Sequence, residues 1–107
     1  MAALYHGFKT STTPGTAVPL ATGTVPVPAT WITFFPRVVS GTGNAGEVRI
    51  GGVPLAADSG AIPSGSGCPI RPGDASVAWP VQDYDLRSIF LDVNQSGDGV
   101  QFVWGLL

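Results

Sequence analysis

The residues with the clearest potential for metal chemistry lie between positions 92 and 98. Asp92, Asn94, Ser96 and Asp98 place side-chain oxygens at alternate positions, as the first half of a calcium-binding loop does. Position twelve of such a loop falls on Val103, which has no oxygen where a bidentate glutamate is needed. Asn, Asp and Gly are also the residues that tight turns favour. We therefore predict a turn here and no metal site.

Other side chains that could act in catalysis are few and scattered. His6 is the only histidine, and no serine or cysteine lies in a recognisable nucleophile motif, so neither a catalytic triad nor a zinc site is indicated. Asp83 and Asp85 could supply a carboxylate pair for glycoside chemistry. We expect them instead to cap a turn and to pair with Arg87. The sequence thus predicts no catalytic residue, no cofactor and no enzymatic activity.

The three tryptophans suggest a different function, the binding of carbohydrate. Aromatic faces stack on sugar rings, and jelly-roll folds include lectins. Trp31, Trp79 and Trp104 all lie in strand-like patterns, however, and a small sandwich uses such large side chains to fill its core. We expect all three in the core, and keep a small carbohydrate-binding module as an alternative function.

The turn at residues 94–99 joins two runs in which every second residue is apolar, residues 89–93 and 100–104. Such alternation is typical of strands with one buried face. We predict that the two runs pair as a β-hairpin at the centre of the fold. Their apolar faces consist of Ile89, Leu91 and Val93 in the first run and of Val100, Phe102 and Trp104 in the second.

The rest of the chain also favours strands. Its 15 glycines and 10 prolines are spread over almost the whole length and leave little room for an α-helix, so we expect only one helical turn, near residues 85–88, capped by Asp85. Residues 30–35 are predicted to form a central strand that Pro36 ends. In residues 47–50 we expect Val48 and Ile50 to point inward and Glu47 and Arg49 outward.

These elements predict an all-β fold, an antiparallel β-sandwich or jelly roll of about seven or eight short strands without a substantial helix. We expect a single domain over residues 16–107. Residues 1–15 are rich in Thr, Ser and Gly, and are predicted to form an extended N-terminal arm or a weak edge strand. Residues 54–67 contain little to bury, and we expect them to form a long loop and a contact surface.

The charge of the chain points to assembly with other proteins. Only 11% of the residues are charged, against about 25% in an ordinary soluble domain, and a surface poor in charge is typical of an interaction site. The five basic residues are scattered, so we expect no direct binding of nucleic acid. No secretory leader or membrane-spanning run is recognisable, and Cys68 is the only cysteine, which is consistent with synthesis in a reducing cytoplasm.

Five short motifs follow one another along the chain. They are Asn44-Ala45-Gly46, Val48-Arg49-Ile50-Gly51-Gly52, Gly67-Cys68-Pro69-Ile70-Arg71-Pro72-Gly73, Leu86-Arg87-Ser88-Ile89-Phe90 and Gly97-Asp98-Gly99-Val100. Their order resembles that of small β-sandwich virion proteins of tailed bacteriophages. The resemblance covers about residues 16–104 and implies a structural protein of the virion, most of all a capsid decoration or cement protein on the capsid surface, with head-fibre base and tail or connector components as alternatives.

On this interpretation the partners are the major capsid protein and further copies of the chain, as a dimer or trimer, and the chain is made in the cytoplasm of the host. Repeated contacts of modest size would then stabilise the capsid. Apolar residues in the arm, in the long loop, on the outer side of a strand and at the C-terminus are the interface candidates. They are Tyr5, Phe8, Pro54, Leu55, Ile62, Phe90, Leu106 and Leu107.

Overall fold

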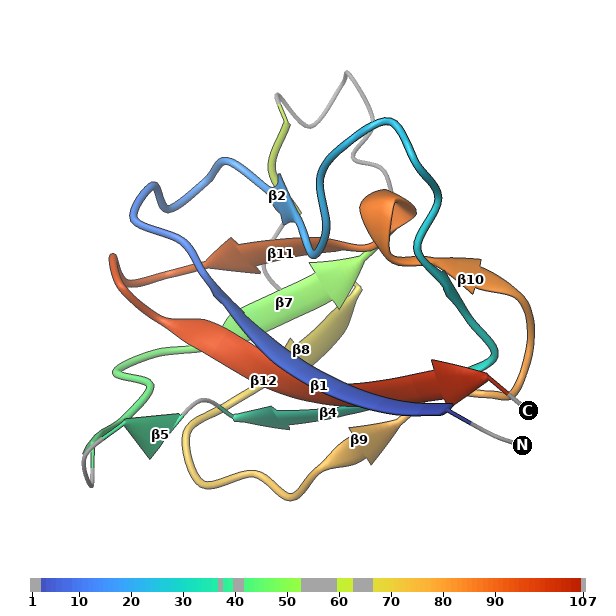
Figure 1. Cartoon of the computed structure of the whole chain (residues 1–107). Coiled ribbons are helices and arrows are strands. Elements are labelled where there is room, and N and C mark those ends of the chain that lie inside the picture. The colour runs from blue at the N-terminus through green and yellow to red at the C-terminus, as the bar shows by residue number, and fades with distance from the viewer. Residues whose placement is uncertain (1–2, 37, 40–41, 53–59, 63–66, 107) are drawn as a thin grey trace.

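The computed structural model describes residues 3–36, 38–39, 42–52, 60–62 and 67–106, and within them the fold is all-β. Two four-stranded antiparallel sheets pack as a β-sandwich, which confirms the predicted fold class (Figure 1). No helix of the described residues is long and apolar enough to span a membrane. The described strands number twelve, more than the seven or eight expected, because six of them contain only two residues.

The first sheet has the strand order β1-β12-β4-β9, and the second has the order β2-β11-β7-β8. Two small two-stranded sheets, β10-β3 and β5-β6, lie outside them. In the first sheet the strands are β1 (Ala3–Thr10), β12 (Gly99–Leu106), β4 (Trp31–Pro36) and β9 (Val77–Ala78). In the second they are β2 (Val18–Pro19), β11 (Phe90–Val93), β7 (Val48–Gly51) and β8 (Cys68–Ile70). The small sheets consist of β10 (Tyr84–Asp85), β3 (Pro28–Ala29), β5 (Val38–Val39) and β6 (Thr42–Gly43).

The core lies between the inner faces of the two sheets. Phe34 and Phe102 face each other across β4 and β12, and both are buried. The second sheet contributes Ile50 and Leu91, which are paired across β7 and β11 and fully buried. The predicted inward positions are therefore confirmed. As expected, residues 31–35 form a central strand, of which Pro36 is the last residue.

The prediction that residues 89–93 and 100–104 pair as a hairpin is wrong. β11 pairs with β2 and β7 in the second sheet, whereas β12 pairs with β1 and β4 in the first. The segment between them crosses from one sheet to the other, with Gly97 at a φ of 92°. The two apolar faces do meet, but they stack across the core. Alternation specifies which face of a strand is buried, and it is the same for two strands that pair and for two that stack.

The N-terminal segment belongs to the first sheet. Of the arm and the edge strand expected for residues 1–15, the structure has an edge strand over Ala3–Thr10, which pairs with β12 from Ala3 opposite Leu106 to Thr10 opposite Gly99. A Cβ atom on Gly99 would lie 2.1 Å from the Lys9 carbonyl oxygen, so only glycine allows this close approach.

Candidate binding surface

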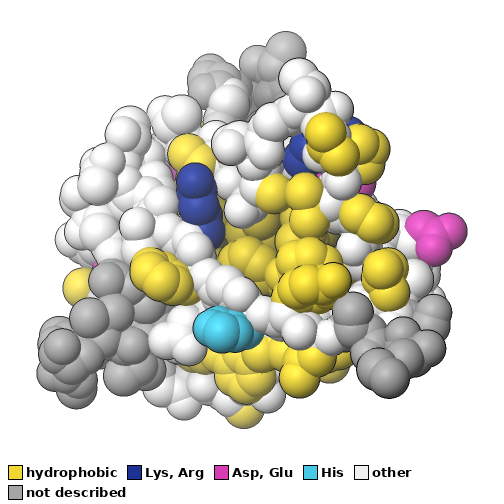
Figure 2. All heavy atoms as spheres, in the orientation of Figure 1, with side chains coloured by type: hydrophobic (Ala, Val, Ile, Leu, Met, Phe, Trp, Pro, Cys, Tyr) yellow, Lys and Arg dark blue, Asp and Glu magenta, His cyan; other side chains and the backbone are white. Residues whose placement is uncertain are grey.

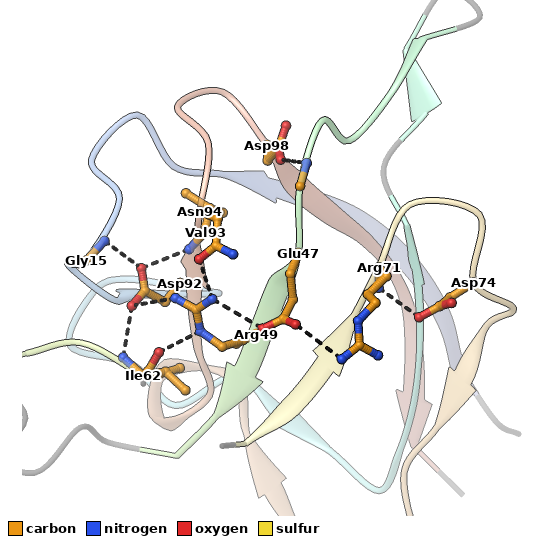
Figure 3. Close-up of polar contacts among 11 residues, drawn as sticks. Gly15, Glu47, Arg49, Ile62, Arg71, Asp74, Asp92, Val93, Asn94 and Asp98 are labelled. Atoms are coloured by element: carbon orange, nitrogen blue, oxygen red, sulfur yellow. Dashed lines mark hydrogen bonds and ion pairs between the residues drawn. The ribbon is translucent and has the colours of Figure 1, made fainter. Parts of the chain in front are cut away.

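A buried ion pair on the outer side of the second sheet fixes two loops. Arg49 of β7 and Asp92 of β11 are opposite each other, with Nη2 3.5 Å from Oδ2, and Asp92 is fully buried (Figure 3). Asp92 accepts hydrogen bonds from the backbone N–H groups of Gly15, Ile62 and Val93 at 3.0, 2.9 and 2.8 Å. Arg49 donates from Nε to the Ile62 carbonyl at 2.6 Å. The pair therefore secures the segments around residues 15 and 62 to the sheet.

This arrangement corrects the expectation that Arg49 points outward into solvent. Arg49 is on the outer side of the sheet, but only 4% of it is exposed because the two loops cover it. Its Nη1 also donates to Asn94 Oδ1 at 2.6 Å and contacts Glu47 Oε1 at 3.3 Å. Glu47 in turn reaches the Arg71 guanidinium at 3.6 Å (Figure 3). Arg49 and Asp92, charged residues of a type that a small domain normally leaves in water, are thus buried here.

The last carboxylate of the calcium-like segment is also occupied by the backbone. Asp98 is buried and accepts hydrogen bonds from the N–H groups of Ala45 and Gly46 at 3.0 and 2.8 Å. Beside it, the Asn44 amide donates to the Gly99 carbonyl at 2.8 Å and accepts from the Gly99 N–H at 3.0 Å. The described residues contain no group of three or more His, Cys, Asp or Glu side chains placed to hold a metal ion. These polar groups stabilise loops.

The helical turn expected at residues 85–88 is confirmed as a 3₁₀ turn, Leu86–Ser88, with Asp85 as its N-cap. Asp85 accepts from the Arg87 backbone N–H at 3.0 Å and from Nη2 of the same residue at 2.8 Å. These bonds, with a further one from the Val27 N–H, lower the pKa of Asp85 from 3.8 to about 2, and the carboxylate raises the pKa of Arg87. Asp85 thus caps this turn and pairs with Arg87, as expected.

The outer face of the first sheet is a surface without charged side chains. Pairing registers place Leu4 beside Gly105, His6 beside Val103 and Phe8 beside Gln101, and they continue into β4 and β9. None of the side chains on this face is Lys, Arg, Asp or Glu. We call it the outer apolar face; its side chains are Leu4, His6, Phe8, Trp31, Thr33, Phe35, Ala78, Gln101 and Val103.

Several side chains of this face are well exposed. Leu4 is 70% and Phe8 66% exposed, and Phe35 is also accessible. Figure 2 shows hydrophobic side chains gathered above β1, toward the second sheet, and a smaller group below it, with few charged side chains among them. One end of the face is hollowed by a pocket of about 360 Å³, lined by Phe35 and Gln101 of the face and by Pro36, Gly73, Asp74 and Ser76. The face therefore offers mainly apolar contact area.

The predicted interface candidates differ in how exposed they are. Tyr5 and Phe8 are exposed on β1, and Tyr5 stacks on Trp104 with ring centroids 4.5 Å apart. Phe90 and Leu106 are half-buried. Ile62 is only 6% exposed and is held by the ion pair, so its side chain belongs to the interior of the chain. Pro54, Leu55 and Leu107 lie outside the described residues.

Sequence reasoning missed most of the outer apolar face. Trp31 was expected in the core together with Trp79 and Trp104, but its register opposite Gly105 places it on the outer face, whereas the other two pack against the core. A signal was present in the sequence. Trp31 and Phe35 alternate with the buried Ile32 and Phe34, and apolar residues at both sets of positions indicate a strand covered on both sides.

Comparison with protein-family models, with curated proteins and with solved structures finds no match.

Proposed function

We propose that this chain is a non-enzymatic structural protein of a tailed-bacteriophage virion, most simply a capsid decoration protein that binds the outer surface of the capsid and stabilises it. The observation that carries the proposal is the outer apolar face, a four-stranded sheet surface without a charged side chain. A soluble protein rarely leaves such a surface in water unless another protein covers it.

The use of charge inside the molecule supports the same proposal. The sequence contains 12 charged residues, five basic and seven acidic, and Arg49, Asp92 and Asp98 among them are buried. They hold loops in place, so they do not contribute to solvation of the surface. A rigid sandwich with a preformed apolar face loses little conformational entropy on binding. Repetition of such a contact over the symmetric lattice of a capsid would resist expansion of the capsid more than a single contact does.

Capsid binding can be tested directly. Purified protein mixed with undecorated capsids should co-sediment to saturation and raise the temperature at which the capsids open. Thr33→Glu, in the middle of the outer apolar face, should abolish binding because it buries an unpaired charge. Val25→Glu is the matched control, since Val25 is 73% exposed and lies in a loop outside this face. A wild-type protein that stays free, or equal loss in both variants, would contradict the proposal.

Carbohydrate binding is the second candidate, because Trp31 and Phe35 lie on one side of β4 on the outer face. Aromatic side chains in such positions can stack on sugar rings. A glycan array separates the two functions. Binding of a defined sugar that Trp31→Ala abolishes, without co-sedimentation on capsids, would favour the carbohydrate-binding module.

A further inference from the structure

The four outer edges of the two sheets differ in how they are protected. β9 has two residues and is followed closely by Pro80, β2 is Val18–Pro19, and β8 carries Pro69 at its middle position. Short edge strands and prolines are the usual means of preventing further strand pairing. β1 is the exception: it has eight residues, no proline, and one charged residue, Lys9, near its end. Within the described chain, only β1 is an edge suited to accept another strand.

The direction of the backbone groups on β1 follows from its last contacts with the β11–β12 connection. Ser11 donates its N–H to the Asp98 carbonyl and accepts from the Gly97 N–H, so its backbone points toward β12. Backbone direction alternates along an antiparallel strand. The N–H and C=O groups of Leu4, His6 and Phe8 therefore point away from β12, toward the outer edge. No described strand pairs with β1 on that side.

The side chains of β1 are complementary to those of β1 in a second copy of the chain. If β1 pairs antiparallel with β1 of a second copy so that the two His6 residues are opposite each other, Leu4 of each copy lies opposite Phe8 of the other. Cross-strand pairs of an aromatic and an aliphatic residue stabilise a sheet. In the same register Lys9 lies opposite Ala3, so the two lysines are at opposite ends of the junction and do not repel each other.

We propose that two copies of this chain associate through β1, with a twofold axis at His6, so that their first sheets form one continuous eight-stranded sheet. A twofold axis is the commonest symmetry of protein oligomers. Pairing of seven residues, together with Leu4, Tyr5 and Phe8, would bury on the order of 1,000 Å² in total, the lower limit for a specific interface. The dimer is therefore expected to dissociate on dilution.

This inference deepens the proposed function, because it assigns a surface to the self-association of a virion protein. It is tested on the free protein, without capsids, so its failure and the failure of capsid binding are distinguishable. A monomer that binds capsids would overturn the β1 junction and leave the decoration role intact. A dimer that does not bind capsids would do the reverse.

Sedimentation equilibrium over a wide range of concentration provides the first test. The wild-type chain should show a reversible monomer–dimer equilibrium, and Phe8→Lys should be monomeric because each lysine would replace an apolar contact with Leu4 of the other copy. Val81→Lys is the matched control, because Val81 is 65% exposed and belongs to no described strand. A wild-type monomer, a trimer, or equal dissociation of both variants would overturn the proposal.

A proline separates strand pairing from a merely hydrophobic contact. His6→Pro removes an N–H that points to the outer edge, so pairing with β12 and the thermal midpoint should change little while the dimer is lost. A folded His6→Pro variant that still dimerises would overturn the proposal. If this variant fails to fold, the variants His6→Asp and His6→Lys decide whether the two copies pair through β1.

The register is tested by exchanging charges at position 6. His6→Asp and His6→Lys should each be monomeric, because like charges would be opposite each other at the twofold axis. A mixture of the two should form a heterodimer, visible by native mass spectrometry. Homodimers of either variant, or a mixture that stays monomeric, would exclude a junction centred on His6.

Discussion

Asp92 and Arg49 hold the two hydrogen-bonding groups of one backbone unit, since Asp92 accepts the Ile62 N–H and Arg49 donates to the Ile62 carbonyl. Two side chains of opposite charge thus do what a neighbouring strand does for a residue in a sheet. The ion pair is therefore more than an attraction between charges, because it satisfies the backbone groups of Ile62, which lies outside the described strands (Figure 3).

Loss of the carboxylate should destabilise the fold strongly. Asp92→Asn removes the fully buried carboxylate of the pair and leaves Arg49 with Glu47 as its remaining described acidic partner. Loss of one partner of a buried ion pair costs about 3–5 kcal/mol. Urea unfolding measures the change, and Asp83→Asn, at an exposed position, is the control. An Asp92→Asn protein that unfolds at the wild-type urea concentration would show that the pair contributes nothing.

Replacement of both partners should not restore stability. Apolar replacement of a buried ion pair is often neutral or stabilising, but here Arg49→Met with Asp92→Leu would also leave the backbone groups of Ile62 and the N–H of Gly15 without partners. Each such group costs about 1–3 kcal/mol when it stays buried. We expect the double variant to be less stable than wild type in urea; equal or higher stability would assign the pair to simple charge compensation.

Gly99→Ala tests the close approach of β1 to the start of β12. The added Cβ atom would lie 2.1 Å from the Lys9 carbonyl oxygen and 2.8 Å from the Thr10 Cα, both backbone atoms, so the strands must separate. We expect a loss of about 3 kcal/mol in unfolding free energy, with increased amide hydrogen exchange along β1. Gly52→Ala is the matched control, because no atom of the described residues lies within 4 Å of its added Cβ, and we expect it to be close to neutral.

Asn44→Ala should loosen the crossing between the two sheets. The Asn44 amide pairs with both backbone groups of Gly99, as a strand residue would. Its removal leaves these groups unsatisfied in a buried environment, and we expect a loss of about 2 kcal/mol in the free energy of unfolding. Gln95→Ala, at an exposed position of the same connection, should change the thermal midpoint little, and an equal effect of both variants would contradict the assigned role.

The Asp85 cap predicts part of the pH dependence of stability. Its folded pKa of about 2 is below the ordinary 3.8, so the folded protein holds the charged form more strongly than the unfolded chain does. This stabilisation is fully present above pH 3.8 and is lost as the pH falls toward 2. The decline of the thermal midpoint over this range should be shallower in Asp85→Asn than in wild type. Parallel curves would show that the cap contributes no acid sensitivity.

Alternation and breaker residues were sufficient to predict most of the fold. These features depend on neighbours in the sequence. They are the buried faces at Ile50, Leu91 and Phe34, the end of β4 at Pro36, and the turn that Asp85 caps. The pairing of strands depends on distant contacts. Nothing within residues 89–104 distinguishes a hairpin from a crossing between sheets, because the Asn44 side chain that pairs with Gly99 lies in another part of the chain.

The burial of Arg49 and Asp92 could not be predicted for a related reason. Both occupy outward positions of their strands, where charge normally meets water, and the segments that cover them have no apolar pattern that would indicate packing. The outer apolar face was only partly recognised because Trp31 was assigned to the core by residue type rather than by its position in the strand. Its remaining members become visible only when the register joins β1, β12 and β4.

The position of β12 also determines when the sheet can form during synthesis. β12 is the last strand along the chain, yet it is the sole described partner of β1, the first strand, and it lies at the centre of the first sheet (Figure 1). While the polypeptide emerges from the ribosome, β1 therefore cannot pair with β12 until the residues between these two strands have been translated. Pairing over such a sequence separation is slow. A nascent chain with an open, apolar first strand is a natural substrate for chaperones, and slower elongation would prolong its exposure to aggregation.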